Sequence, residues 1–202
     1  MYPWEEVSVD MIGPWKVSIN NFEYQFRALT CIDTIIGLPE VISVDNATSK
    51  SVAITFEANF LSQYPAPVRC LLDNGNEFLG PSFSSMLARN KIKSVSITVK
   101  NPQSNAIVER MHQSISTMIA ISLCENPPVK YEDVSNLVFT KCMSAQYAVR
   151  STVKRSLKYT PGELAFERDM NLPVPSTANW QELFQRKKEL ITQNNEKENL
   201  SR

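Results

Sequence analysis

Three carboxylates occupy positions in the sequence that favour metal-dependent chemistry. Asp10 lies in the alternating segment EEVSVDMI, Asp73 follows the apolar run CLL, and Glu109 lies near the start of a long predicted helix. Positions 74–108, which are 35 residues, separate the last two acids. Carboxylates that share a site raise one another's pKa by repulsion, and a divalent cation relieves that repulsion. Hard oxygen ligands of this kind suit Mg²⁺ or Mn²⁺.

The chemistry that such a site supports is displacement at a phosphodiester. Two divalent ions about 3.5–4 Å apart can activate the attacking oxygen and stabilise the leaving oxygen. The Asn74-Gly75 pair permits a positive backbone φ and a close approach of a substrate to the chain. Ser104 or Asn105 is able to cap the helix that carries Glu109.

The elements that must position these acids follow from hydrophobic periodicity. Period-2 alternation and short apolar runs predict strands at 5–12, 22–32, 40–44, 68–72 and 94–99. Helical spacing predicts helices at 50–64, 82–91, 104–123 and 132–150. The first three strands form an antiparallel meander because their connections are short. The order of elements predicts an α/β fold with a mixed sheet and helices on its faces. If the first and fourth strands are neighbours, Asp10 and Asp73 project at one rim.

Composition sets limits on the partners and the compartment. The 202 residues carry no net charge and are 43% hydrophobic, which predicts one globular domain with a core. A nucleic-acid surface would therefore have to be local. We see no cationic leader and no apolar run near 18 residues, so we expect neither a signal peptide nor a membrane span. The four scattered cysteines and the single histidine exclude a zinc module and indicate reduced, buried thiols.

The segments around the three acids resemble the catalytic core of retroviral and gypsy-type LTR-retrotransposon integrases. The resemblance is carried by WEEVSVDMIGPW, DNGNEF, NPQSNAIVERMHQ and YAVRSTVKRSLKYTPGELAFERDM, and it covers about residues 4–175. It implies a ribonuclease H-like fold, in which strands 1–3 are antiparallel and strands 4 and 5 run parallel to strand 1. We expect an integrase core at 1–170 and a C-terminal extension at 171–202, partly helical or disordered.

The resemblance also implies a function. Asp10, Asp73 and Glu109 would be the catalytic residues and the ligands of two Mg²⁺ (or Mn²⁺) ions. The enzyme would be a polynucleotidyl transferase and DNA endonuclease that processes the 3′ ends of retroelement DNA and joins them to target DNA. We expect a homo-oligomer, at least a dimer, that works in the nucleus and in cytoplasmic integration complexes. We also expect the chain to be part of a longer protein, without the zinc-binding module and the C-terminal DNA-binding module of the family.

Candidate DNA contacts come from two sources. The resemblance implies that a flexible loop around the triad contacts DNA, and it assigns to that loop Asn74, Gly75, Gln103, Ser104 and Asn105. Gln113 and Ser116 stand where some retroviral cores place DNA-holding lysines, and we count Gln113 among the candidates. Arg150, Lys154 and Lys158 would form a basic stripe if that segment is helical. The chain departs from many relatives at Ala106 and Asn101.

Several other residues have simpler interpretations. One histidine on a helix flank is more often a packing or hydrogen-bonding residue than a ligand, so we expect that role for His112. Asp33, just after the second strand, is expected to be structural or part of a strand-end turn. Trp4 and Trp15 are expected to pack against the first strand. The basic segment around Lys154 could equally be a solvated surface.

Two alternatives to an integrase stay open at this point. The first is a catalytically inactive, co-opted module that binds DNA or a protein partner, against which the intact triad argues. The second is another ribonuclease H-like nuclease, such as an RNA hydrolase or a cut-and-paste transposase. Metal-dependent nicking separates the first alternative from the enzyme, and a preference for RNA–DNA hybrids would favour the second.

Overall fold

The computed structural model of the chain describes residues 2–96, 102–154 and 157–200; the side chains of 102–108 and of several residues in the last helix lie outside this description. The chain forms two compact units, Met1–Tyr147 and Ala148–Arg202. The first unit contains the sheet and carries all three predicted triad residues. The division falls within the 1–170 segment that the sequence assigns to one core, and that assignment stays a prediction.

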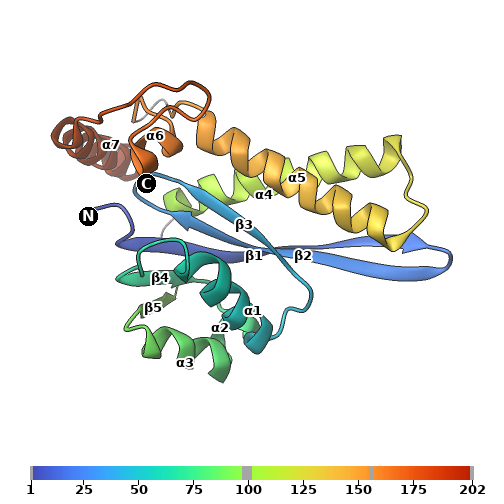
Figure 1. The fold of residues 1–202 in the computed structure, drawn as a ribbon. Coiled ribbons are helices and arrows are strands. Elements are labelled where there is room, and N and C mark those ends of the chain that lie inside the picture. Colours follow the sequence, from blue (N-terminus) through green and yellow to red (C-terminus); the bar gives the residue numbers. More distant parts are fainter. Residues whose placement is uncertain (1, 97–101, 155–156, 201–202) are drawn as a thin grey trace. The chain divides into compact units, whose positions relative to one another are not determined.

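A five-stranded mixed sheet organises the first unit (Figure 1). Its strands are β1 (Glu6–Ile19), β2 (Phe22–Asp33), β3 (Pro39–Val44), β4 (Arg69–Leu72) and β5 (Lys93–Ser96). They lie in the order β3-β2-β1-β4-β5. The first three pair antiparallel, whereas β4 runs parallel to β1 and β5 runs parallel to β4. The predicted ribonuclease H-like fold class is confirmed.

The first strand is longer than the sequence pattern predicts. We expected it to end at residue 12, but β1 continues through Gly13-Pro14 to Ile19, and the register with β2 shifts there. Gly13 has a φ of 104°, and a Cβ at that position would lie 2.7 Å from the carbonyl oxygen of Phe26. A β-bulge absorbs the Gly-Pro pair that alone would indicate a break.

Helices α1 (Ser49–Thr55), η1 (Phe56–Leu61), α2 (Asn76–Leu79) and α3 (Pro81–Arg89) cover one face of the sheet (Figure 1). The largest side chains of this core are fully buried phenylalanines, among them Phe56, Phe60 and Phe83. Burial of each contributes about 1.5–3 kcal/mol to folding. The helix predicted at 50–64 is present as an α-helical part followed by a π-helical part. The short α2 was not predicted.

Helices α4 (Pro102–Glu125) and α5 (Tyr131–Ser151) lie over the other face (Figure 1). The described buried stripe of α4 consists of Met111, Ile115 and Ile119 at helical spacing. The prediction that Ser104 or Asn105 caps this helix is wrong, because the backbone is already helical from Pro102. Proline favours the first helical position, where its missing N–H is not needed.

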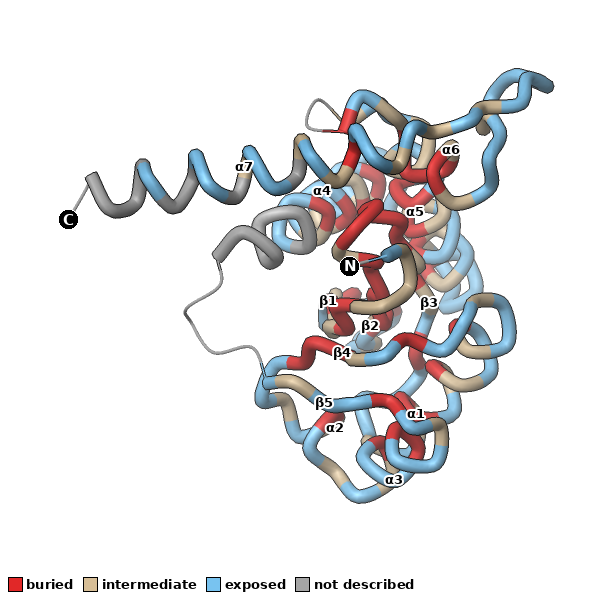
Figure 2. Tube along the Cα trace, turned by 90° about the vertical axis from the view of Figure 1, so that its left-hand side faces the viewer, coloured by how far each residue is buried: buried red, intermediate tan, exposed pale blue. Residues whose placement is uncertain are grey.

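The second unit contains the short helix α6 (Pro161–Phe166) and the long helix α7 (Trp180–Leu200). Thr160 and Glu163 form a reciprocal capping box at the start of α6. Within the expected C-terminal extension at 171–202, α7 continues to Leu200. Figure 2 shows α7 as a mostly exposed helix, whereas most residues of β2 and β4 are buried. Among the described helices, none has the length and apolar character needed to cross a membrane.

Candidate active site

The parallel part of the sheet brings Asp10 and Asp73 to one rim. Val9 of β1 pairs with Leu72, the last residue of β4. Asp10 and Asp73 each follow one of these paired residues, so they stand at the same level of the sheet. Leu72 in turn pairs with Ser96, and both β4 and β5 end there. Carboxyl ends of parallel strands are where α/β sheets place their ligand sites.

Asp10 titrates abnormally because of its surroundings. Its pKa is raised from 3.8 to about 6, mainly by burial, although a hydrogen bond from the Met11 backbone to Oδ1 (2.7 Å) lowers it. The charges of Asp73, Glu77 and Glu109 raise it further. These carboxylates are therefore close enough to interact, and a cation among them would reverse the shift.

The turn after Asp73 orients that carboxylate. Oδ1 of Asp73 accepts a hydrogen bond from the Gly75 N–H at 2.9 Å, and the side chain of Asn74 accepts one from the Ser96 hydroxyl at 2.7 Å. The expectation that Gly75 uses a positive φ is wrong, because its φ is −62°. The glycine instead provides space: a Cβ there would lie 2.8 Å from Cδ of Glu77 and 2.9 Å from Oδ1 of Asp73.

Glu77 is a fourth acid that the sequence analysis missed. It lies in the first turn of α2, and its charge is one of those that raise the pKa of Asp10. The available signal was its place in DNGNEF, four residues after Asp73 and at the N-terminal end of a short helix, where acids are favoured.

Helix α4 presents Glu109 from the other side of the rim. One turn later Nε2 of His112 lies 2.8 Å from the Thr30 hydroxyl of β2, and one turn beyond that Ser116 accepts a hydrogen bond from the Trp15 indole at 3.1 Å. The hydrogen-bonding role predicted for His112 is confirmed. Glu109 itself is exposed.

Two further predictions about structural residues are confirmed. Asp33 is fully buried, where Oδ1 accepts hydrogen bonds from the N–H groups of Ile35 and Ile36 and Oδ2 accepts one from Trp4. Trp4 also stacks on Tyr64, with 4.7 Å between ring centroids. The Asp33 carboxylate therefore connects the N-terminal segment at Trp4 to the turn after β2.

The donor chemistry at the rim fits a hard divalent cation, since it consists of carboxylate oxygens. Within 2–96, 102–154 and 157–200, no set of three His, Cys, Asp or Glu side chains is already placed to hold one ion. Asp10, Asp73 and Glu109 are the residues that could hold it, with Glu77 beside them. Their mutual repulsion in the metal-free protein is consistent with carboxylates that do not converge on one point.

The other candidate DNA contacts are dispersed. Asn74 and Gly75 lie in the turn at the rim, and Gln113 is exposed on α4. Gln103, Ser104 and Asn105 lie in the first turns of α4, but their side chains are outside the described part of the chain, as are the departures at Ala106 and Asn101.

The prediction that Arg150, Lys154 and Lys158 form a helical basic stripe is wrong. Helix α5 ends at Ser151, one residue after Arg150. Lys154 pairs with Tyr159 in an isolated bridge, and Lys158 has a φ of 61° in the turn between them. Arg150 thus lies in the last turn of α5 while Lys154 and Lys158 lie beyond the helix, so the three cations do not share one helical face. Their contact with DNA stays a prediction.

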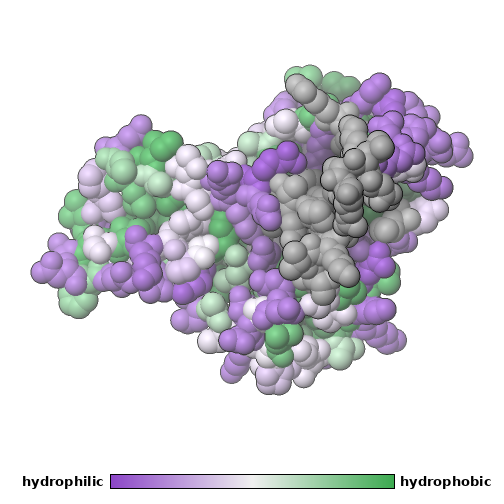
Figure 3. Space-filling view, turned by 180° about the vertical axis from the view of Figure 1, so that it is seen from behind, coloured by the Kyte–Doolittle hydropathy of each residue, from purple (hydrophilic) through white to green (hydrophobic). Residues whose placement is uncertain are grey.

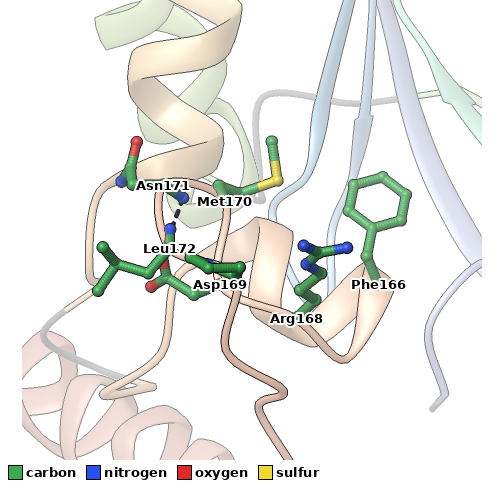
Figure 4. A pocket seen from close by; sticks show the side chains of 7 residues that line it. Phe166, Arg168, Asp169, Met170, Asn171 and Leu172 are labelled. Atoms are coloured by element: carbon green, nitrogen blue, oxygen red, sulfur yellow. Dashed lines mark hydrogen bonds between the residues drawn. The ribbon is translucent and has the colours of Figure 1, made fainter.

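A pocket of about 390 Å³ lies in the second unit and is lined by Phe166 at the end of α6 and by the loop that follows it (Figure 4). Asp169 shapes this loop, because its Oδ1 accepts hydrogen bonds from the backbone N–H groups of Asn171 (2.7 Å) and Leu172 (2.6 Å). None of the predicted site residues lines the pocket.

The sheet and its carboxylate rim define the class of the protein: it is an α/β protein with the ribonuclease H-like fold. No protein-family model matches the chain. Over 172 residues, 85% of the chain, it is 28% identical to the retrovirus-related Pol polyprotein from transposon 412 of Drosophila melanogaster. Over 180 residues, 88% of the chain, it is 28% identical to the Pro-Pol polyprotein of feline foamy virus. The chain spans 13% and 14% of the lengths of these two polyproteins.

Solved structures share the fold. The HTLV-2 integrase catalytic core domain in complex with magnesium, in its trimeric form, aligns with a TM-score of 0.57 at 18% identity, covering 81% of this chain and 97% of that one. A chain of the simian T-cell lymphotropic virus intasome in complex with PP2A regulatory subunit B56 gamma aligns with a TM-score of 0.62 at 17% identity, covering 88% and 59%. The chain is thus a homologue of retrotransposon and foamy-virus Pol polyproteins with the fold of a retroviral integrase catalytic core, as the sequence resemblance predicted.

Proposed function

We propose that this chain is an integrase catalytic core that processes the 3′ ends of retroelement DNA and transfers them into target DNA with divalent metal. The observation that carries the proposal is the parallel register of β1 and β4, which places Asp10 and Asp73 at one rim, each one residue beyond the paired Val9 and Leu72. The charges of Asp73, Glu77 and Glu109 act on Asp10 there and, with burial, raise its pKa. Perturbed carboxylates at the carboxyl ends of strands are typical of functional sites. The likeness to Pol polyproteins supports the same assignment.

Asp10, Asp73 and Glu109 would hold two Mg²⁺ or Mn²⁺ ions, which supply activation of the attacking oxygen and stabilisation of the leaving one. The chain contributes orientation. The Met11 N–H holds Oδ1 of Asp10 and the Gly75 N–H holds Oδ1 of Asp73, so each carboxylate has one oxygen fixed by the backbone. A fixed carboxylate loses less conformational freedom when a cation binds. The related HTLV-2 core solved with magnesium supports this choice of ion.

The partners we propose are DNA and a second copy of the chain. Asn74, Gly75 and Gln113 are at or near the rim and are our first candidates for DNA contact. Large apolar side chains on α4 and α5 are exposed, namely Ile121, Tyr131 and Phe139. Figure 3 shows apolar side chains gathered on the face at the end of the first unit that holds the β1–β2 hairpin and the α4–α5 connection. A homo-oligomer would cover such side chains, and we propose that it acts in nuclear and cytoplasmic integration complexes.

The direct test is a strand-transfer and nicking assay on DNA that mimics element ends, with Mg²⁺ or Mn²⁺. We expect Asp73→Asn and Glu109→Gln each to lower the rate at least ~100-fold, because each removes a metal-holding charge. Asp45→Asn, an exposed acid that follows β3, is the matched control and should keep full activity. Unchanged activity of folded Asp73→Asn would sink the mechanism.

The second candidate is a module that binds DNA or protein without cutting. It is the alternative that the sequence analysis left open. Wild-type protein that binds end-mimicking DNA but shows no nicking with either metal would support this candidate over the enzyme.

A further inference from the structure

A short chain of polar contacts connects helix α4 to the backbone and side chain of Asp10. Thr30 stands directly opposite Asp10 in the β1–β2 pairing, and its hydroxyl donates to the Asp10 carbonyl oxygen at 3.1 Å. The same hydroxyl lies 2.8 Å from Nε2 of His112. On the other side of the imidazole ring, Nδ1 lies 3.8 Å from Oδ2 of Asp10. The ring is therefore enclosed between the partner strand and the carboxylate.

The hydroxyl of Thr30 fixes the tautomer of His112. A hydroxyl has one proton to donate, and that proton is directed at the Asp10 carbonyl oxygen. The contact with Nε2 therefore requires His112 to donate from Nε2 and Thr30 to accept. In a neutral ring Nδ1 then carries no proton. At 3.8 Å from Oδ2 it makes no hydrogen bond to the carboxylate. The effect of the ring on Oδ2 therefore depends on the contact between Nε2 and Thr30, which holds the ring in place.

We propose that His112, held by Thr30, is a positioning residue that keeps the Asp10 carboxylate in the orientation needed for divalent metal. This inference rests on the proposed function. Oδ1 of Asp10 is fixed by the Met11 N–H, so the placement of Oδ2 is the remaining freedom of the side chain. The His112 ring occupies the space beside Oδ2. Groups that orient metal ligands in this way typically change metal affinity about 10–100-fold when removed.

The environment of His112 agrees with a positioning role and not with ligation. Its side chain is only 17% exposed. Its Nε2 is already engaged with Thr30, which leaves it unavailable as a ligand.

A second contact of α4 allows two roles of His112 to be distinguished: positioning of the Asp10 carboxylate and anchoring of α4 to the sheet. Ser116, one turn beyond His112, accepts a hydrogen bond from Trp15 and so also holds α4 to β1. Unlike His112, it has no described contact with Asp10. Loss of the Ser116 contact therefore tests the docking of α4 alone.

The experiment measures binding of Mn²⁺ alone by electron paramagnetic resonance, without DNA or turnover, on wild type and five variants. His112→Phe keeps a ring without nitrogens, and Thr30→Val keeps the shape of the side chain without its hydroxyl. We expect each to weaken Mn²⁺ binding by about 10-fold or more, and the double variant to be no weaker than the worse single one. Thr30→Ser, which restores the hydroxyl, and Ser116→Ala should stay within about twofold of wild type. Thermal unfolding verifies that each protein is folded.

The outcomes separate this inference from the proposed function. Unchanged Mn²⁺ affinity in folded His112→Phe or Thr30→Val overturns the inference alone, and so does an equal loss in Ser116→Ala, which would reduce His112 to a general anchor of α4. Wild-type protein that binds no Mn²⁺ overturns the metal-dependent function and the inference with it. If His112→Phe fails to fold, the Thr30→Val and Thr30→Ser pair decides.

Discussion

Asp10 and Asp73 occupy matching positions on two neighbouring parallel strands, each one residue beyond the paired residues Val9 and Leu72. Their proximity is thus built into the backbone register and does not depend on flexible loops. Strand β4 ends at this level while β1 continues into its hairpin with β2, so one acid is half-buried and the other is exposed. The two carboxyl groups consequently have different electrostatic environments at one rim.

The raised pKa of Asp10 predicts that this acid destabilises the metal-free protein at neutral pH. A carboxyl group whose folded pKa is about 6, above its ordinary 3.8, contributes stability that is fully present below pH 3.8 and is lost as the pH rises through 6. Asp10→Asn should therefore raise the unfolding temperature at pH 7.5 by roughly 2–4 °C, about 1 kcal/mol for a chain of this size. We discount the full shift because the side chain is 36% exposed. Melting curves from pH 3.5 to 7.5 test this; a difference that does not shrink toward pH 4 would contradict it.

Divalent metal should stabilise the folded protein in proportion to its binding. At a concentration 100 times the dissociation constant, a ligand of the folded state adds about 2.7 kcal/mol. We expect Mg²⁺ or Mn²⁺ to raise the unfolding temperature of wild type at pH 7.5 by several degrees and that of Asp73→Asn by much less. The increase should fade as the pH falls below about 6, because protons then compete with the cation for Asp10. Ca²⁺-free buffer with chelator is the baseline. An equal increase in both proteins would place the bound metal elsewhere.

Gly75→Ala should impair activity far more than stability. The φ of −62° is ordinary for alanine, so the substitution does not strain the backbone. Alanine also lowers the conformational entropy of the unfolded chain, which slightly favours the folded state. The new Cβ would nevertheless press on the carboxyl groups of Asp73 and Glu77. We expect at least a ~10-fold loss of strand transfer, since a misplaced metal-holding group lowers the rate strongly, with less than ~1 kcal/mol change in the free energy of unfolding.

Gly80→Ala is the contrasting variant for Gly75→Ala. A Cβ at Gly80 would lie 2.4 Å from Cβ of Ser49, which is packed between helices and not at the rim. This variant should lose stability by about 1–3 kcal/mol through overpacking and keep its activity per folded molecule. Urea denaturation and single-turnover rates give both quantities. The assignment fails if Gly80→Ala loses activity and Gly75→Ala does not.

Asp33 should be one of the most sensitive positions for stability. Its fully buried carboxylate accepts three backbone N–H groups from two segments, the turn after β2 and the N-terminal Trp4. In Asp33→Asn an amide NH₂ group replaces one of the two carboxylate oxygens. Whichever oxygen is replaced, the NH₂ group faces a backbone N–H donor and cannot accept its hydrogen bond, so the free energy of unfolding should fall by about 3 kcal/mol. Asp169→Asn is the control: its carboxylate accepts comparable backbone bonds in a more open loop, and the loss should stay below ~1 kcal/mol. Similar losses at both positions would show that burial is not the cause.

Local sequence patterns were enough to predict the order of the strands and main helices along the chain, together with the three acids proposed as metal ligands. Periodicity is local information, and the strands around Asp10 and Asp73 carry it strongly. Their side chains alternate between a core face and the face that carries Asp10 and Thr30. For the same reason the fold class was predictable before any coordinates.

Features that depend on a partner far away in the chain could not be predicted from local patterns and are visible in the folded protein alone. The extension of β1 through Gly13-Pro14 requires β2 opposite it to absorb the bulge. Gly75 is needed for the space between two carboxylates, and not for a positive φ, because α2 folds Glu77 back toward Asp73. The contact of His112 with Thr30 joins residues 82 positions apart, and no local pattern encodes it. Sheet register and helix docking place the acids at the rim. The distances between the acids are set by hydrogen bonds between distant segments, which the local periodicity around each acid does not encode.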